Sequence, residues 1–409
     1  APAIRFKGFS DAWEQRKLGE LVDRVVRKNT NNESTLPLTI SAQYGLVDQI
    51  TYFNNRVASR DVSNYYLVLN GEFAYNKSTS DGYPFGAVKR LDLYEKGVLS
   101  TLYIVFAPKK EQQIDSDYLT VFFDTDRWHK GVAERAAEGA RNHGLLNISA
   151  EDFFDIDLSV PKDIVEQKQI GAFIRQLDNL ITLHQRKFEK LTNVKKSMLE
   201  KMFPQNGSSY PEIRFKGFTD PWEQRKAIDI ADYSKGNGYS KGDLSDAGTP
   251  IILYGRLYTK YQFAISEVDT FAVPRNGAVY SQGNEVIVPA SGETAEDIAR
   301  ASAVEKSGVL LGGDLNILRP FDFINPLFLA LAISNGEPQK ELAKKAQGKS
   351  VVHIHNTDIQ EVTIAYPSRT EQDRIVSVFR QLDHLITLHQ RELKKLQNIK
   401  KSMLEKMFV

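Results

Sequence analysis

The sequence predicts an α+β fold in which two mixed α/β domains with pseudo-twofold symmetry are separated by two long antiparallel coiled-coil helices. Two internal repeats lead to this prediction. Ile4–Lys17 (IRFKGFSDAWEQRK) matches Ile213–Lys226 (IRFKGFTDPWEQRK) at 12 of 14 positions. Gln167–Phe203 matches Gln372–Phe408 at 25 of 37 positions. Between these repeats lie two inserts of about 150 residues with little common sequence, so one scaffold is built twice around different surfaces.

The composition is that of an ordinary globular protein. The 409 residues are 41% hydrophobic and 26% charged, and the repeat divides them into two domains of roughly 200 residues each. No apolar run reaches the ~18 residues of a membrane span, and the first residues do not resemble a secretory signal. Cysteine is absent, which excludes disulfides, thiolate zinc sites and cysteine nucleophiles. We therefore expect a reducing, cytoplasmic location.

Positive charge is concentrated in the second repeat. Its two copies carry 16 Lys/Arg and 7 Asp/Glu, a balance of +9, so the rest of the chain sums to −8 for a net charge of +1. One interpretation is that these cations simply solvate long helices. The other is that the chain binds nucleic acid and that a partner supplies part of the phosphate contact.

The second repeat predicts a long helix in each half. Apolar residues recur at spacings of three and four over some 30 positions, and neither Gly nor Pro interrupts them after Gly171. Thirty-seven residues would make a rod of roughly 55 Å. An apolar stripe of this length has to be buried against another surface, and the second copy of the helix can supply it. Two copies in one chain favour an antiparallel pair. The predicted seam comprises Leu177, Leu180, His184, Leu191 and Met198 in one copy and Leu382, Leu385, His389, Leu396 and Met403 in the other. We interpret His184 and His389 as polar register markers rather than metal ligands.

Turn-forming residues give the domain boundaries. Pro204–Pro211 is rich in Pro, Gly, Ser and Asn and predicts a linker. The expected organisation is domain 1 at 1–160, a helix at 161–203, a linker at 204–212, domain 2 at 213–366 and a helix at 367–409. Within the inserts, the predicted strands are Thr35–Ile40, Glu72–Tyr75, Thr101–Phe106, Asp155–Val160, Pro250–Tyr254, Val286–Val288, Asn316–Leu318 and Glu361–Ala365. The predicted short helices are Asp117–Lys130 and Pro326–Asn335.

Common catalytic motifs are missing from the sequence. We find no phosphate loop G-x-x-x-x-G-K-[ST], no H-E-x-x-H zinc helix and no G-x-S-x-G elbow. The amino-methyltransferase signature [DNS]-P-P-[YF] is absent as well, since Gly82–Gly86 has a single proline. His353 and His355 alternate along a predicted strand, but two ligands without a third make a weak metal site. We expect no catalytic residues, no metal and no cofactor on this chain.

Each insert carries three polar loops suited to contacting DNA. Arg pairs bidentately with guanine and Asn or Gln with adenine, whereas Lys and Ser hold phosphates. In the first insert the candidates are Ser41, Gln43, Tyr44, Asn76, Lys77, Ser78, Tyr83, Arg141, Asn142 and His143. In the second insert they are Arg256, Tyr258, Ser291, Thr294, Lys349 and Ser350. For any single residue, an ordinary solvated surface loop is the alternative; the matched set of three loops favours recognition.

These motifs together resemble the specificity subunit of type I restriction–modification systems over essentially the whole chain. The resemblance rests on the doubled frame RFKGF-[ST]-D-x-W-E-Q-R-K at Arg5 and Arg214, on Pro161…Glu166-Gln167 and Pro367…Glu371-Gln372, and on LDxLITLHQR at Leu177 and Leu382. Each motif alone is modest, but all of them twice in the same order are specific.

The resemblance implies two target-recognition domains, each of which reads half of a split DNA sequence, and paired helices that set the unread gap. It also implies a non-catalytic subunit that holds two methyltransferase subunits and can add restriction subunits. S-adenosylmethionine, Mg²⁺ and ATP would then belong to those partners only.

Two other functions remain open from the sequence. A coiled-coil adaptor whose inserts bind protein or peptide would explain the helices, but not why two differing inserts share one frame. A standalone nuclease or methyltransferase would need activity from this chain alone, and the missing motifs speak against it.

Overall fold

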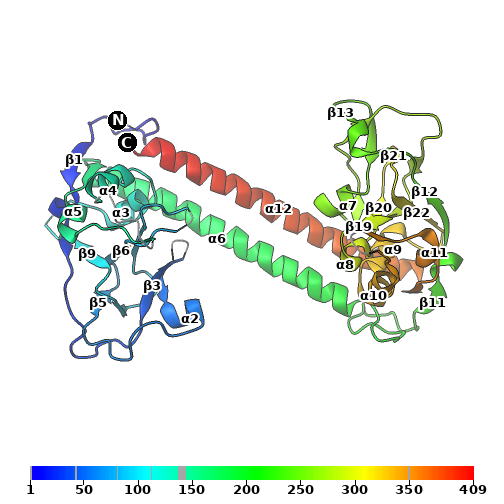
Figure 1. The fold of residues 1–409 in the computed structure, drawn as a ribbon, viewed down its shortest axis with the longest axis horizontal. Coiled ribbons are helices and arrows are strands. Elements are labelled where there is room, and N and C mark those ends of the chain that lie inside the picture. Colours follow the sequence, from blue (N-terminus) through cyan, green and yellow to red (C-terminus); the bar gives the residue numbers. More distant parts are fainter. Residues whose placement is uncertain (1, 42–43, 81, 112, 137–143, 349–350) are drawn as a thin grey trace. The chain divides into compact units, whose positions relative to one another are not determined.

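The computed structural model describes residues 2–41, 44–80, 82–111, 113–136, 144–348 and 351–409. It forms two compact units (Figure 1): unit 1 comprises Ala1–Gln185 with Arg391–Val409, and unit 2 comprises Arg186–Gln390. The long helices are α6 (Ile164–Lys201) and α12 (Arg369–Met407). Unit 1 therefore contains the start of α6 and the end of α12, whereas unit 2 contains the end of α6 and the start of α12.

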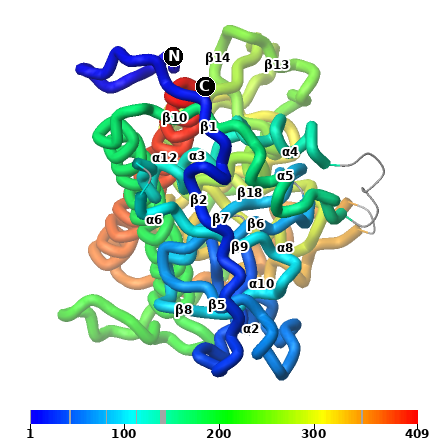
Figure 2. Tube along the Cα trace, turned by 90° about the vertical axis from the view of Figure 1, so that its left-hand side faces the viewer, coloured from blue at the N-terminus to red at the C-terminus, as the bar shows by residue number. Residues whose placement is uncertain are grey.

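Unit 1 is built around a four-stranded antiparallel sheet of order β2-β9-β6-β7. The strands are β1 (Glu14–Lys17), β2 (Val22–Arg24), β3 (Leu38–Ser41), β4 (Gly45–Asp48), β5 (Tyr66–Leu69), β6 (Phe73–Asn76), β7 (Ala87–Arg90), β8 (Lys96–Leu99), β9 (Ile104–Pro108) and β10 (Asp157–Val160). The short helices are α1 (Leu18–Leu21), α2 (Gln49–Phe53), α3 (Ser116–Phe123), α4 (His129–Arg135) and α5 (Ala150–Phe154). The pairs β3–β4 and β5–β8 are antiparallel, and β1 lies antiparallel to β10 (Figure 2).

The central strand of unit 1 is buried on both faces. Phe73 and Tyr75 point into the main core, where Phe73 stacks on Phe106 at 5.3 Å between ring centroids. Ala74, which points to the opposite face, belongs to a second apolar cluster under the β3–β4 and β5–β8 strands. Alternate residues of a strand face opposite sides, so β6 holds both layers of the unit together.

Unit 2 has two five-stranded sheets, of order β12-β22-β18-β20-β15 and β13-β16-β14-β21-β17. Its strands are β11 (Glu223–Lys226), β12 (Ala231–Lys235), β13 (Leu244–Ser245), β14 (Thr249–Ile252), β15 (Ala264–Ile265), β16 (Phe271–Ala272), β17 (Tyr280–Gln282), β18 (Glu285–Pro289), β19 (Ser291–Gly292), β20 (Ser302–Val304), β21 (Ser307–Leu311), β22 (Leu315–Pro320), β23 (Val352–His353) and β24 (Thr363–Tyr366). Its helices are α7 (Arg256–Thr259), α8 (Ala295–Ile298), α9 (Pro326–Ile333), α10 (Gly336–Lys345) and α11 (Asn356–Gln360), with 3₁₀ turns η2 (Ala227–Asp229) and η3 (Lys241–Asp243).

The buried helix of unit 2 has clear sequence signals at its start. The Asn325 side chain accepts hydrogen bonds from the amides of Leu327 and Phe328, and Pro326 occupies the first helical turn. Asn is a favoured N-cap, and Pro fits a position whose amide needs no partner. Helix α9 is apolar on all sides and is buried against β18 and β20.

The repeated frame closes each unit with the same ion pair. Arg5 donates two hydrogen bonds to Glu166, of 2.6 and 2.7 Å, and Arg214 donates two to Glu371, both of 2.8 Å. Both carboxylates lie in the first turn of a long helix and are almost fully buried. The frame arginine therefore fixes the N-terminal segment of each repeat to the start of the helix of the same repeat.

The glutamine that follows each of these glutamates explains the Pro…Glu-Gln motif. Gln167 accepts from the amide of Asp115 at 2.8 Å and donates to the carbonyl of Pro161 at 2.8 Å. Gln372 accepts from the amide of Asn325 at 2.8 Å and donates to the carbonyl of Pro367 at 2.9 Å. Asp115 and Asn325 are the N-caps of α3 and α9. One buried side chain thus joins the helix, the proline segment before it and a core helix.

The end of each long helix completes the core of a unit. In unit 1 the Phe408 ring packs on Tyr118 at 5.6 Å and on Trp13 at 6.2 Å, and the end of α12 lies beside the start of α6 (Figure 1). In unit 2 the equivalent Phe203 packs on Phe328 at 5.6 Å and on Trp222 at 6.0 Å. The predicted fold class is confirmed.

The two helices run antiparallel within each unit. In unit 1 Lys400 pairs with Asp178 at 2.7 Å, and in unit 2 Lys195 pairs with Asp383 at 2.5 Å. The two pairs are equivalent in the internal repeat, because Lys195 aligns with Lys400 and Asp178 aligns with Asp383. In unit 1, α12 ends at Met407 in the same core that holds the start of α6, so the helix directions are opposed.

The structure corrects part of the predicted seam. Leu177 and Leu382 are buried, Leu191 and Met198 pack on the unit 2 core, and Leu396 and Met403 pack on the unit 1 core. The prediction for Leu180 and Leu385 is wrong, because their side chains are 42% and 39% exposed. The covered stripe steps from position 177 to 181 and 184, alternating four and three residues, and position 180 falls outside it. His184 and His389 are half-buried, and their role as register markers stays a prediction.

Replacing Arg5 with alanine should lower the free energy of unfolding by about 3 kcal/mol, because the 1% exposed Glu166 carboxylate would lose its partner. Arg5 keeps 14% of its side chain exposed, which places the loss at the low end of the usual range. Urea unfolding followed by circular dichroism measures it. Arg24→Ala, which breaks an exposed pair with Glu151, is the matched control and should cost less than about 1 kcal/mol. If both variants lost the same free energy of unfolding, the Arg5–Glu166 ion pair would not have the stabilising role assigned to it.

Candidate nucleic-acid interface

In unit 1 the loop after β6 pairs with Gly144–Leu146 through an antiparallel bridge, and we call this pairing the unit 1 ribbon. Ser78 forms an antiparallel bridge with Leu145, the amide of Thr79 donates to the Gly144 carbonyl at 2.6 Å, and the amide of Leu146 donates to the Lys77 carbonyl at 3.0 Å. The loop after β6 is thereby held against the segment before α5. Of the third predicted loop, 139–144, only Gly144 lies among the described residues, and the structure pairs it with Thr79.

The candidate side chains on this ribbon differ in their freedom to contact a ligand. Ser78 and Tyr83 are exposed. Asn76 accepts from the amide of Ser78 at 3.0 Å, and Lys77 donates to the carbonyl of Ile148 at 3.3 Å. Ser78 and Tyr83 are therefore available to a partner molecule, whereas Asn76 and Lys77 shape the loop.

Unit 2 contains the equivalent ribbon. Ser291 and Gly292 of β19 pair antiparallel with His353 and Val352 of β23, and Gln347 bridges His353. Ser291 stands where Ser78 stands in unit 1, and β23 takes the place of the segment around Leu145. The same backbone device is thus present twice, with different side chains.

Tyr258 holds the unit 2 ribbon through a hydrogen bond to its backbone. Its hydroxyl donates to the Ser291 carbonyl at 2.8 Å, and the Ser291 hydroxyl lies 3.2 Å from His353 Nδ1. Burial raises the pKa of Tyr258 well above its usual value, although Arg300, whose guanidinium lies 5.2 Å from the ring centroid, opposes the shift. Tyr258 is therefore a neutral hydrogen-bond donor at physiological pH. The structure thus joins Tyr258 and Ser291, two candidates from different predicted loops, and their contact with DNA stays a prediction.

Two further candidates in unit 2 have structural partners. Arg256 is bound to Asp269 at 2.5 Å and to the Glu267 carbonyl at 2.9 Å, which leaves 8% of its side chain exposed. Thr294 caps α8 by accepting from the amide of Asp297. Arg256 thus braces the α7 segment, whereas Thr294 is exposed at the ribbon end.

The first predicted loop of unit 1 lies at the turn between β3 and β4. Ser41 is buried and its hydroxyl accepts from the amide of Tyr44, whose ring is largely exposed. Gln43, Arg141, Asn142, His143, Lys349 and Ser350 lie outside the described residues.

Sequence reasoning missed two side chains of the unit 2 site. Arg300 covers the rings of Tyr258 and Tyr261, and His353 lies on the ribbon itself. The alternation of His353 and His355 was the available signal. It indicated a strand, but metal binding was the only role considered for it. Within the described ranges, no three His, Cys, Asp or Glu side chains gather in a way that could hold a metal ion.

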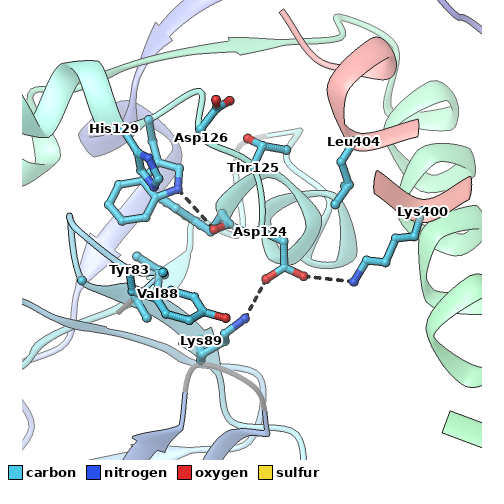
Figure 3. Close-up of a pocket in the computed structure, with 14 residues that line it drawn as sticks. Tyr83, Val88, Lys89, Asp124, Thr125, Asp126, His129, Lys400 and Leu404 are labelled. Carbon is cyan, nitrogen blue, oxygen red and sulfur yellow. Dashed lines mark hydrogen bonds and ion pairs between the residues drawn. The ribbon is translucent and has the colours of Figure 1, made fainter. Parts of the chain in front are cut away.

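A cavity of about 400 Å³ lies in unit 1 between the β6–β7 loop, the end of α3 and the end of α12 (Figure 3). Lys89 and Lys400 approach the Asp124 carboxylate from two sides, at 2.7 and 3.6 Å. Burial opposes the charge on Lys400, but Asp124 and Asp178 outweigh it and raise its pKa. Burial lowers the pKa of His129, an effect that Asp126 opposes. Asp124 therefore links Lys89 of β7 to Lys400 of α12. The two lysines and the two aspartates that line the cavity, Asp124 and Asp126, balance, so it offers no excess positive charge to a phosphate.

Tyr258→Phe should lower the free energy of unfolding by about 1–2 kcal/mol, because the Ser291 carbonyl loses a donor in a half-buried site. Amide hydrogen exchange at Ser291 and His353 should also accelerate. Urea unfolding and exchange mass spectrometry check both effects. Tyr254→Phe, at an exposed neighbour, is the control and should change neither; a similar change in both variants would refute the assigned role of the hydroxyl.

Membrane spans are also missing from the described part of the chain: none of its helices is both long and apolar enough to cross a bilayer.

Comparison with known proteins identifies the family. The family model for the type I restriction modification DNA specificity domain matches residues 11–193 and again 219–398. The type I restriction enzyme MjaVIII specificity subunit of Methanocaldococcus jannaschii is 21% identical over 407 residues, which cover 96% of this chain and 91% of that protein.

A solved structure shares the fold. The crystal structure of the type I restriction-modification system S subunit from M. genitalium matches with a TM-score of 0.60 and 14% identity, covering 100% of this chain and 99% of that one. The HsdS subunit from Thermoanaerobacter tengcongensis covers 98% of this chain and 97% of its own at 17% identity, with a TM-score of 0.43. At these identities the first likeness concerns the fold, and the second score is too low to add to it. Because the family model matches both halves and most of the chain, this protein belongs to the type I restriction modification DNA specificity family and is a DNA-recognition subunit of such a system, not its catalyst.

Proposed function

We propose that this subunit reads a bipartite, asymmetric DNA target and directs adenine methylation by partner subunits. The observation that supports this most is the doubled ribbon, Ser78–Leu145 in unit 1 and Ser291–His353 in unit 2. The major groove of B-DNA admits a two-stranded β-ribbon. Two ribbons at equivalent places in the two units, with different side chains, would read two different half-sites.

The long helices would set the unread gap between the half-sites. The first turns of helix α6 place Ile170 and Ile174 in the unit 1 core. The helix ends next to Met202 and Phe203, which lie in the unit 2 core. Helix α12 begins in unit 2 and ends in unit 1. Because both ends of both helices are buried, their length is the quantity that would fix the spacing.

The domain assignment follows from this proposal. Target-recognition domains at 1–160 and 213–366 would read DNA, and helices at 161–203 and 367–409 would separate them. The partners would be two methyltransferase subunits, which carry S-adenosylmethionine, and restriction subunits, which carry ATP and Mg²⁺. Such a complex would act in the cytoplasm. Of the candidate residues, the exposed Tyr44, Ser78, Tyr83 and Thr294 are the first to test on DNA.

Co-expressing this chain with its methyltransferase subunit in a methylation-free host should produce one split, asymmetric motif of modified adenines. Mapping modified adenines across the host genome measures this, and the motif should vanish when this chain is omitted. A palindromic motif would contradict two different half-sites. No new methylation, despite a stable complex, would favour an adaptor role.

Inserting four helical residues after Gln185 and four after Gln390 should widen the unread gap by one or two base pairs. Four residues add ~6 Å of helix, and DNA rises ~3.4 Å per base pair. Adenine mapping with the inserted variant gives the new gap, and both half-sites should stay as they were. Replacing the same number of exposed helix positions with alanine, without insertion, is the control. If the gap were unchanged in the inserted variant, the length of the long helices would not set the spacing between the half-sites.

A further inference from the structure

Each unit exposes an isoleucine at the same position of the repeated frame. Ile4 is 36% exposed and Ile213 is 43% exposed. A single exposed apolar residue is ordinary. Here the same residue is exposed in both units, although the two inserts share little sequence. Because the side chain is exposed, packing in the core does not explain why isoleucine stands at this position twice.

Both isoleucines are held at the end of a long helix. The amide of Ile4 donates to the carbonyl of Lys406 in α12 at 3.0 Å, and the amide of Ile213 donates to the carbonyl of Lys201 in α6 at 2.9 Å. The last carbonyls of a helix lack internal partners, so the backbone contact has a structural reason. That contact uses the amide only and would form with any side chain except proline.

A lysine three residues further on is also identical and exposed. Lys7 and Lys216 each precede a glycine with positive φ, +104° at Gly8 and +99° at Gly217. A type II turn needs glycine at its third position, which accounts for both glycines. It does not need lysine at its second position. Among the described residues, neither lysine side chain makes a hydrogen bond or an ion pair.

Folding accounts for other identical residues of the frame. Arg5 and Arg214 bind the buried glutamates, and Trp13 and Trp222 pack on the phenylalanines that end the long helices. Ile4, Lys7 and their counterparts have no such role. A surface that is kept in both halves without a folding role is suited to a partner that binds both halves in the same way.

We propose that these side chains form a docking patch, which we call the strap patch: Ile4 and Lys7 in unit 1, and Ile213 and Lys216 in unit 2. Each patch takes one copy of the same protein, the methyltransferase subunit, which presents an apolar side chain to the isoleucine and carboxylates to the lysines. Two equal patches require two copies of one partner. The inference rests on the proposed function for the identity of that partner.

The test changes one patch at a time in the full-length chain. Ile4→Glu with Lys7→Glu alters unit 1, and Ile213→Glu with Lys216→Glu alters unit 2. Native mass spectrometry of the chain with excess methyltransferase subunit should show two copies on the wild type, one copy on either double variant and none on the quadruple variant. Each altered patch should lose at least tenfold in affinity.

Matched controls place the same charges elsewhere on the same units. Val57→Glu with Lys130→Glu changes exposed residues of unit 1, and Val273→Glu with Lys235→Glu changes exposed residues of unit 2. Both should still bind two copies. Circular dichroism and thermal unfolding establish that every variant is folded.

A second readout needs no substitution. On adding the methyltransferase subunit to the wild-type chain, amides of Phe6–Phe9 and Phe215–Phe218 should gain protection from hydrogen exchange. Two copies on the quadruple variant, or no protection in a wild-type complex, would overturn the strap patch and leave the proposed function standing. A wild-type chain that binds no methyltransferase subunit would overturn both.

Discussion

The bidentate ion pair between a frame arginine and the buried glutamate at the start of a long helix is the interaction on which each unit depends. Glu166 and Glu371 are almost without solvent, so each needs its arginine to avoid an unpaired buried charge. The pair holds the N-terminal segment in place. That segment carries Trp13 or Trp222 to the end of the opposite helix, and it leads into the strand that pairs with β10 or β24. The next residues, Gln167 and Gln372, accept hydrogen bonds from the N-cap amides of α3 and α9 and so connect the long helices to these core helices.

The frame makes the same contacts in both units, whereas the ribbons next to it differ. In unit 1 the loop after β6 is held by backbone hydrogen bonds to Gly144 and Leu146. In unit 2 a tyrosine hydroxyl and an arginine above its ring do part of that work. Side chains at the ribbon surface therefore carry little of the folding energy and can change without loss of the scaffold. This is the arrangement expected of a protein whose two recognition surfaces diverge while its architecture does not.

Periodicity and repeats predicted most of the fold, because helix stripes and turn residues are local signals. The strand expected at Val286–Val288 lies inside β18, and both long helices begin and end within a few residues of their expected limits. The helix expected at Asp117–Lys130 is instead broken into α3 and α4. There the Thr125 hydroxyl and the Trp128 indole both bond to carbonyls at the end of α3, a tertiary arrangement with no local signature. The site was harder for the same reason. Residue type marked Arg256 as a base reader, but only the fold reveals that Asp269 already binds it.

The position of Phe408 has a consequence for biosynthesis. Its ring lies between Tyr118 and Trp13, in the core of the unit that the ribosome makes first. That core is completed only when the last turn of α12 has been translated. Unit 2 draws on one uninterrupted stretch of chain, Arg186–Gln390, and can close as soon as that stretch emerges. Domains usually fold in the order of their synthesis. Here the half that is made later can be finished earlier, and the core of unit 1 stays open until the last turn of α12 has been made.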